Sequence, residues 1–384
     1  FMKRKIYNSL LRWKNEEKGK VALLVEGARR VGKSFIVEEF AKNEYKSYIL
    51  VDFAHIGKAM KEVFDEYLNE TDTFLIFLQN VAGVQLYERE SLIIFDEVQK
   101  YPMARQAIKH LVADGRYDYI ETGSLVSINE NTEDILLPSE ERPLQMYPMD
   151  FEEFLWALGD EMTMPFVKTC FENRCQLGPM HRKAMTLFRQ YLIVGGMPAA
   201  VEKYINTNNL QDVMAEQQAI IRLYKQDIAK YDPDHKLYIQ EIFDRIPAEL
   251  DAKNKRFILK NLNENIKFSR YQNSFLWLKD AGVALPVYNV EEPTVPLILS
   301  SCRNLFKLFM ADIGLLASLY ADGIQLKILD NEPSINFGSV YENAVAQELC
   351  AHGFQLYYYN NKRQGELDFV IEQNGEVLPL EVKS

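Results

Sequence analysis

The sequence predicts an α/β fold with a parallel sheet in residues 1–150. Short apolar runs alternate there with segments of helical periodicity, and these runs occupy residues 21–25, 48–53, 91–95 and 117–122. Strands that alternate with helices form parallel sheets, because the connecting helices cover both faces. A glycine-rich segment follows the first run and leads directly into a helical pattern at residues 35–40. This order of strand, turn and helix start is typical of an anion-binding site.

The glycine-rich segment is a complete Walker A loop, which predicts that the parallel sheet is that of a P-loop NTPase. The loop consists of Gly27, Ala28, Arg29, Arg30, Val31, Gly32, Lys33 and Ser34. Backbone N–H groups of such a loop cradle phosphates, and glycines let the chain approach them closely. We expect Lys33 to reach the outer phosphates and the Ser34 hydroxyl to bind Mg²⁺. All eight residues are therefore predicted to bind a nucleoside triphosphate.

The third apolar run ends in two acids, Asp96 and Glu97, which is the pattern of a Walker B strand. Ligands bind at the carboxyl ends of the strands in parallel sheets. Asp96 is expected to hold Mg²⁺ through water, and Glu97 to orient and polarise the attacking water. The alternative is a strand that ends in an exposed acidic turn. The Walker A loop earlier in the chain favours the Mg²⁺ site.

Two further roles in ATP hydrolysis have candidate residues. The fourth run leads into Thr122 and Ser124, either of which is placed to act as a polar sensor near the γ-phosphate; a plain turn is the alternative. An arginine often stabilises the charge that develops on the phosphate. Arg142 is the first candidate and Arg116 the second, although exposure to solvent is the default for both. No Asn-Lys-x-Asp segment for guanine recognition is present, so the predicted nucleotide is ATP.

Composition excludes several classes of protein. The 384 residues are 47% hydrophobic and 26% charged, which fits two to four domains with sizeable cores. No apolar run is long enough for a membrane span, and no apolar segment typical of a secretory signal follows the basic start. The four cysteines and five histidines show no metal-binding spacing, and the cysteines fit reduced thiols in the cytoplasm. The net charge of −11 argues against a general polyanion-binding surface but is compatible with a local basic groove.

The pattern changes after residue 150. A mostly helical stretch runs to about residue 230 and is followed by several short helices. Residues 283–290 read as a hairpin-like segment, and Pro293 and Pro296 mark a loop behind it. A last segment of mixed helix and strand begins near Asn336.

These motifs, taken in order, resemble a known family. Besides the Walker motifs and residues 122–124, the matching segments are 148–155, 195–198, 277–282, 312–316, 338–343 and 365–369. Over nearly the whole chain they resemble the bacterial and archaeal AAA-type (AAA+ superfamily) P-loop ATPases with a C-terminal region of unknown function. The resemblance implies an ATPase domain with an N-terminal helix (1–150), a helical lid (151–232), a winged-helix-like module (233–332) and a nuclease-like domain (333–384). The segment 277–282 fits the turn into the wing, a part that contacts DNA in some winged helices and is a structural connector in others.

The C-terminal acids resemble the PD-(D/E)xK nuclease pattern. Asp368 is followed by Glu381 and Lys383, which share one face of a strand because they are two residues apart. The two carboxylates are expected to share Mg²⁺, Lys383 to steady the attacking hydroxide, and Glu342 to add a further acid. The alternative is a solvated acid–lysine pair without cleavage. Nucleases of this class continue past the lysine, so a truncated restriction-endonuclease-like α+β domain is expected.

The sequence therefore predicts a Mg²⁺-dependent ATPase that couples its nucleotide state to C-terminal nucleic-acid-binding or nuclease-like modules. The alternatives are a nucleotide-dependent switch in signalling or defence, and a remodeller of other proteins. Expected partners are ATP, DNA, and a protein partner or a second copy of the chain, without a membrane.

Overall fold

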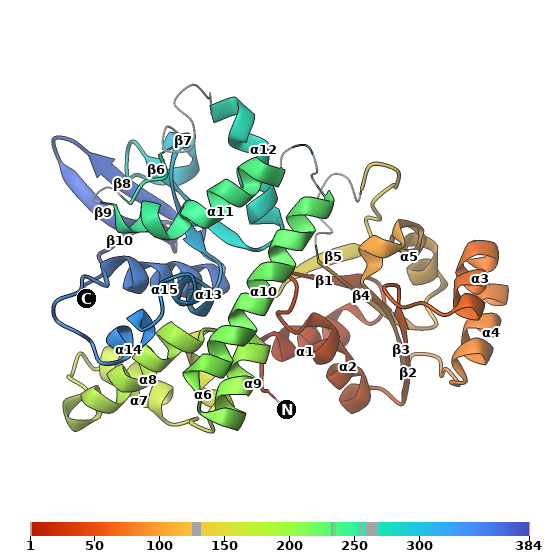
Figure 1. Ribbon diagram of the computed structural model, residues 1–384. Helices are drawn as coiled ribbons and strands as arrows, with labels where there is room; N and C mark the ends of the chain where they lie inside the picture. The colour runs from red at the N-terminus through yellow and green to blue at the C-terminus, as the bar shows by residue number, and fades with distance from the viewer. Residues whose placement is uncertain are drawn as a thin grey trace. The chain divides into compact units, whose positions relative to one another are not determined.

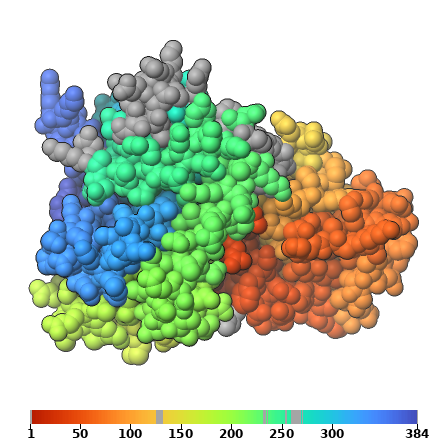
Figure 2. Space-filling model, viewed as in Figure 1, coloured from red at the N-terminus to blue at the C-terminus, as the bar shows by residue number. Residues whose placement is uncertain are grey.

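The computed structural model describes residues 2–124, 132–231, 234, 236–252, 255–258 and 268–383. The chain divides after Met146 into two compact units, here called the first unit (Lys3–Met146) and the second unit (Tyr147 onward). Figure 1 traces the helices and strands of each unit, and Figure 2 draws the same view with all atoms as spheres. Within the described residues, none of the helices has the length and apolar character needed to cross a membrane.

The first unit contains a five-stranded sheet in the order β2-β3-β4-β1-β5, and every strand pair in it is parallel. Its strands are β1 (Ala22–Glu26), β2 (Ser47–Asp52), β3 (Ser91–Asp96), β4 (Asp118–Gly123) and β5 (Glu141–Gln145). The four predicted strands are confirmed to within one residue, and β5 adds an edge strand that was not predicted. Strand β4 lies between the strands that carry the two Walker motifs, as in the expected class of ATPase.

Helices surround this sheet because each presents an apolar stripe to it. They are α1 (Ile6–Glu17), α2 (Lys33–Glu44), α3 (Lys58–Tyr67), α4 (Thr71–Ala82) and α5 (Pro102–Asp114), with a 3₁₀ turn η1 (Val98–Lys100). The core between β2, β3 and helices α3–α5 is aromatic: the ring of Phe64 makes edge contacts with Phe53, Phe74 and Phe95 at centroid distances of 5.0, 5.1 and 5.5 Å. Such pairs add to the stability that burial provides.

The second unit begins with helices and ends with a mixed sheet. Its helices are α6 (Phe151–Ala157), α7 (Thr163–Glu172), α8 (His181–Val194), α9 (Pro198–Thr207), α10 (Leu210–Tyr231), α11 (Lys236–Asp251), α12 (Phe268–Asp280), α13 (Ile313–Ser318), α14 (Ile324–Leu329) and α15 (Gly338–Ala351). Its strands are β6 (Ala284–Val290), β7 (Ser301–Met310), β8 (Tyr357–Asn361), β9 (Gly365–Gln373) and β10 (Glu376–Leu380). The predicted helical stretch therefore holds α6 to α10, and the predicted mixed segment holds α15 and β8 to β10.

One sheet joins two segments of the chain that were expected to form separate modules. Its order is β10-β9-β8-β6-β7, in which β6 and β8 are parallel and the other pairs antiparallel. The segment 283–290, predicted to be hairpin-like, is mostly the single strand β6, and its hairpin partner is β7, beyond the proline loop. The prediction was wrong because strand-like residues do not reveal which later segment pairs with them. Neither a winged helix nor a nuclease domain is confirmed by this arrangement.

Two of the glycine-containing motifs meet in the second unit. Asp312 caps α13, accepting a hydrogen bond from the N–H of Leu315 at 3.0 Å, and also accepts one from the N–H of Gly196 at 2.7 Å. A Cβ atom on Gly196 would lie 2.1 Å from the carbonyl oxygen of Met149, so only glycine fits there. Complete burial raises the pKa of Asp312 to about 6. These contacts fasten the α8–α9 turn to the start of α13.

Candidate nucleotide and C-terminal acidic sites

The Walker A loop has the backbone geometry that phosphate binding requires. Gly32 adopts a left-handed conformation with φ 98° and precedes α2, and its carbonyl oxygen accepts the N–H of Ile36 at 3.1 Å. A Cβ atom on Gly27 would lie 2.2 Å from the carbonyl oxygen of Met146. The two glycines of the motif are therefore needed for different reasons, one for its φ angle and the other for close packing.

Lys33 folds back over the loop. Its Nζ atom donates hydrogen bonds to the carbonyl oxygens of Gly27 at 3.0 Å and Ala28 at 2.8 Å. Burial lowers the pKa of Lys33 to about 8, against the opposing influence of Glu97 and Asp96. The ammonium group is thus held at the loop by weak carbonyl acceptors, which phosphate oxygens can replace.

Three segments of the first unit meet at Asp96. The Ser34 hydroxyl at the start of α2 donates to Asp96 Oδ1 at 2.6 Å, and the Thr122 hydroxyl at the end of β4 donates to the same oxygen. Burial raises the pKa of Asp96, while both hydroxyl donors lower it. The predicted Mg²⁺ ligands and a predicted sensor are therefore within hydrogen-bond distance of one another.

Glu97 follows β3 in a left-handed conformation, with φ 56°. Its N–H donates to Thr122 Oγ1 at 3.2 Å, and its Oε2 accepts Gln99 Nε2 at 2.5 Å and Ser124 Oγ at 3.4 Å. A non-glycine residue with positive φ is a strained element that is common at functional sites. Gln99 was not identified from the sequence, although its position two residues after Glu97 could have indicated a contact with that acid.

A second polar cluster surrounds Glu342 of α15. Glu342 is buried and forms an ion pair with Lys255. Burial raises the pKa of Glu342, Lys255 and Lys307 oppose that rise, and the Asp368 carboxylate adds to it. Glu342 and Asp368 therefore lie within electrostatic reach of each other.

Lys307 of β7 contributes a fully buried ammonium group to this cluster. Its Nζ lies 3.2 Å from Glu366 Oε1 and 4.7 Å from the centroid of the Tyr358 ring. Lysine is rarely buried without such compensation. Neither Lys307 nor Lys255 could be identified from the sequence, because both precede the nuclease-like motif and reach it only through the fold.

The remaining two predicted residues, Glu381 and Lys383, are exposed and follow the end of β10, so the prediction that they share one face of a strand was wrong. Asp368 Oδ2 accepts the N–H of Val382 at 2.8 Å, which brings β9 beside the segment after β10. Lys383 Nζ lies 2.5 Å from Glu381 Oε2, and this contact and the Asp368 charge raise the pKa of Lys383. Glu342, Asp368, Glu381 and Lys383 therefore form one neighbourhood that runs from the core to the surface.

Comparison with known families identifies the first unit. Residues 19–155 match a family model described as an AAA domain. The first unit therefore has an AAA+-type P-loop NTPase fold, and we call it the AAA+ domain. Residues 185–328 and 337–384 match two models described as domains of unknown function (DUF8612 and DUF4143).

Matches to individual proteins are distant. No curated protein matches the chain. Among solved structures, a Walker-type ATPase of Pyrococcus abyssi is 14% identical, with 83% of this chain and 96% of that chain covered and a TM-score of 0.47. The Orc1 protein of Aeropyrum pernix in complex with DNA is 12% identical (86% and 93% covered, TM-score 0.31), and Cdc6p from Pyrobaculum aerophilum is 10% identical (86% and 96% covered, TM-score 0.30). The assignment rests on the family model and on the geometry of the Walker motifs.

The AAA+ domain places both candidate arginines away from its nucleotide loop. Arg142 lies on edge strand β5 opposite Leu23, roughly 13 Å before the loop along the strand, and it forms an ion pair with Glu17. Arg116 precedes β4, and its Nη2 lies 2.6 Å from Asp72. In the described structure, the amino-terminal side of the sheet holds both residues, whereas the Walker motifs lie at the carboxyl ends of its strands.

A different arginine supports the loop from the N-terminal segment. The buried Arg4 donates from Nη1 to the carbonyl oxygen of Val31 at 3.0 Å. In helix α1, Trp13 Nε1 donates to the carbonyl oxygen of Val21 at 2.8 Å. The N-terminal segment therefore contacts both the residue before β1 and the loop of the AAA+ domain, a role that its sequence did not reveal.

Proposed function

We propose that the AAA+ domain binds Mg²⁺-ATP and hydrolyses it. The observation that carries this proposal is the convergence of Ser34 and Thr122 on one oxygen of Asp96. It joins the Walker A helix, the Walker B strand and the sensor strand at the point where a metal ion would be held. Ser34 and Asp96 would hold Mg²⁺, which would supply positive charge against the negative charge that develops on the phosphates.

The neighbouring side chains have distinct tasks in this proposal. Lys33 exchanges its two carbonyl acceptors for phosphate oxygens. Glu97, held by Gln99 and Ser124, orients a water whose oxygen forms a bond to the γ-phosphorus while the bond to the β–γ bridging oxygen breaks. ADP and phosphate leave, and the water proton passes to Glu97 or solvent. Neither Arg142 nor Arg116 reaches its own loop. In this proposal, one of them stabilises the charge that develops on the phosphate in a neighbouring subunit.

Glu97→Gln tests this mechanism. The amide keeps the shape of the side chain but accepts protons poorly, so ATP binding should persist while hydrolysis falls by about 100-fold or more. Fluorescent nucleotide binding and phosphate release measure the two steps separately. Glu90→Gln, at an exposed acid before β3, is the matched control. Wild-type turnover in Glu97→Gln would show that another group positions the water.

We also propose that the cluster of Glu342, Asp368, Glu381 and Lys383 binds Mg²⁺ and cuts or grips nucleic acid. The supporting observation is that Glu342 and Asp368 share one electrostatic environment beside the buried Lys307. The carboxylates would hold the metal, and Lys383 would steady a hydroxide that attacks the phosphodiester phosphorus as the ester P–O bond breaks. Lys307 is then a positioning residue that offsets part of the acidic charge.

Asp368→Ala should abolish metal-dependent cleavage of plasmid DNA and leave ATP hydrolysis unchanged. The first effect follows from the loss of a proposed metal ligand. The second is expected because Asp368 belongs to the second unit and the Walker motifs to the first. Asp322→Ala, at an exposed acid between α13 and α14, serves as the control. Cleavage that survives in Asp368→Ala would show that another group of residues, or a contaminating enzyme, cuts the DNA. If the wild-type protein cuts no DNA, the cluster has only a structural role.

The alternatives for the downstream role have their own signatures. Tight nucleotide retention and slow turnover would favour a switch, since the two nucleotide states would then bias two conformations. Assembly that requires ATP would favour a protein remodeller. A cytoplasmic location is proposed because Cys170, Cys175, Cys302 and Cys350 are all free thiols.

A further inference from the structure

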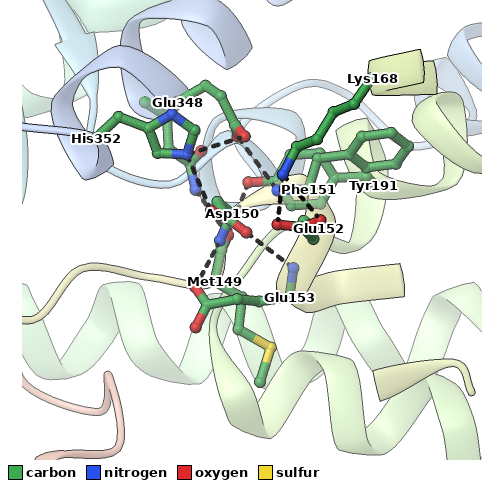
Figure 3. Close-up of polar contacts among 10 residues, drawn as sticks. Met149, Asp150, Phe151, Glu152, Glu153, Lys168, Tyr191, Glu348 and His352 are labelled. Atoms are coloured by element: carbon green, nitrogen blue, oxygen red, sulfur yellow. Dashed lines mark hydrogen bonds and ion pairs between the residues drawn. The ribbon is translucent and has the colours of Figure 1, made fainter. Parts of the chain in front are cut away.

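Side chains from two distant parts of the second unit converge beside α6 (Figure 3). Asp150 precedes α6, whereas Glu348 and His352 lie one turn apart near the end of α15. One ligand atom from each residue lies within 4.8 Å of the others. The geometry points to a binding site for a divalent transition-metal ion of the zinc type, formed by Asp150, Glu348 and His352.

Backbone amides orient both carboxylates of this triad. The N–H of Glu153 donates to Asp150 Oδ1 at 2.8 Å, and the N–H of Phe151 donates to Glu348 Oε2 at 3.2 Å. The other oxygen of each carboxylate faces His352. Metal ligands in proteins are commonly held in this way by outer hydrogen bonds, which fix the direction of the coordinating atom.

The spacing fits a tetrahedral ion. His352 Nε2 lies 3.1 Å from Asp150 Oδ2 and 3.7 Å from Glu348 Oε1. With zinc–ligand bonds of about 2.0–2.1 Å, two ligands of a tetrahedron are about 3.3 Å apart, and the two distances lie on either side of this value. An imidazole nitrogen favours zinc, cobalt or similar ions, because Mg²⁺ and Ca²⁺ prefer oxygen.

Charge and access also suit a cation. The side chains of Asp150, Glu348 and His352 are 2%, 30% and 44% exposed, so the site runs from the core to the solvent. Burial first, and then the charges of Glu348, Asp312, Asp150 and Glu153, raise the pKa of the adjacent Tyr191. The nearby Lys168 is directed to Glu152, at 3.4 Å, as Figure 3 shows. The triad thus lies among an excess of carboxylates that a divalent cation would offset.

Such an ion would link the start of α6 to the end of α15, which are about 200 residues apart in the sequence. Asp150 and His352 are 202 positions apart. Helix α15 also carries Glu342, so the ion would fix the helix that supplies one acid of the C-terminal cluster. The site is independent of the proposed ATP and nuclease chemistry, and its test does not use either activity.

Titration of the metal-stripped full chain with Co²⁺ tests the site, because the visible absorption of Co²⁺ reports its coordination. Millimolar Mg²⁺ is kept present so that sites made of oxygen ligands are occupied. The wild-type protein should bind a stoichiometric amount of Co²⁺ with a spectrum of low coordination number, and Zn²⁺ should displace it and raise the melting temperature. His352→Ala and the milder Glu348→Gln should each weaken binding by about tenfold or more and remove the Zn²⁺-dependent rise.

His181→Ala, at an exposed histidine of α8 outside the triad, should bind Co²⁺ like the wild type. Equal affinity in the wild type and a folded His352→Ala would overturn the proposal. So would a Co²⁺ spectrum with strong thiolate charge-transfer bands that disappears in Cys170→Ser, because the metal would then be held by cysteine. Circular dichroism confirms that each variant is folded.

Discussion

Lys33 shows how burial changes the chemistry of a single residue. Its pKa of about 8 in the free loop places its charge change close to neutral pH, far below that of an exposed lysine. Two carbonyl oxygens hold the ammonium, but they compensate for burial less than a charged partner does. Phosphate oxygens would complete that compensation, so nucleotide binding and protonation of Lys33 should be coupled.

The affinity for Mg²⁺-ATP should therefore decrease at alkaline pH. Below the free-loop pKa of about 8 Lys33 is already charged, whereas above it binding must take up a proton. The dissociation constant should rise towards about tenfold per pH unit between roughly pH 8 and pH 10. Calorimetric titration across this range measures it. Lys33→Arg, which stays charged, should lose the slope even if it binds more weakly; an unchanged slope would assign the proton to another group.

At the scale of elements, close approach explains two motifs that carry no reactive group. The turn between α8 and α9 packs against Met149 and the start of α13 so tightly that Gly195, Gly196 and Gly314 have no room for a side chain. Asp312 then bonds both to the turn and to its own helix. The residues 195–198 and 312–316 are thus two sides of one contact.

Gly196→Ala should destabilise the second unit, because its Cβ would lie 2.1 Å from backbone oxygen. Overpacking of this kind costs about 1–3 kcal/mol, and rigid backbone on the opposing side favours the upper end. Denaturant unfolding followed by circular dichroism gives the free energy. Gly57→Ala, where nothing lies within 4 Å of the new Cβ, should stay within about 0.5 kcal/mol of the wild type. Equal stability of the two variants would contradict the packing argument.

At the scale of the whole molecule, the proposed ATPase cycle would need a partner or a conformational change to drive. A net charge of −11 means that nucleic acid, if bound, must meet a local basic surface rather than a generally basic protein. The free energy available from ATP would act on the second unit, where the acidic cluster and the shared sheet lie. Stimulation of hydrolysis by a partner is the direct sign of such coupling.

We expect double-stranded DNA to raise the steady-state ATPase rate of the complete chain and high salt to abolish the effect, because phosphate contacts release counterions. Phosphate release with and without DNA measures it, and heparin is the control for any polyanion. If DNA does not change the ATPase rate, a nucleotide-dependent switch or a protein remodeller becomes the favoured function. Equal stimulation by heparin would indicate electrostatic contact without recognition of DNA.

Local patterns determined much of the AAA+ domain. Strands β1 and β3 are apolar and buried along nearly their whole length, and β2 and β4 carry apolar residues among polar ones, so all four could be predicted. Strand β5 contains Glu141, Arg142 and Pro143 and could not be predicted. The Walker A residues are contiguous, so their geometry follows from one strand, one turn and one helix. The same reasoning predicted the acids at the end of β3 and the hydroxyls at the end of β4, because parallel strands bring their carboxyl ends to one edge.

Only the tertiary structure decided which residues that are apart in the sequence come into contact. Gln99 reaches Glu97 through a 3₁₀ turn, Lys307 reaches the acidic cluster because β6 pairs with β8, and His352 reaches Asp150 across most of the second unit. No periodicity or spacing encodes such meetings, since they arise from burial summed over many side chains. The sequence by itself thus determined a nucleotide loop and its sheet. The fold decided which charged groups share an environment, and with it where any second chemistry can occur.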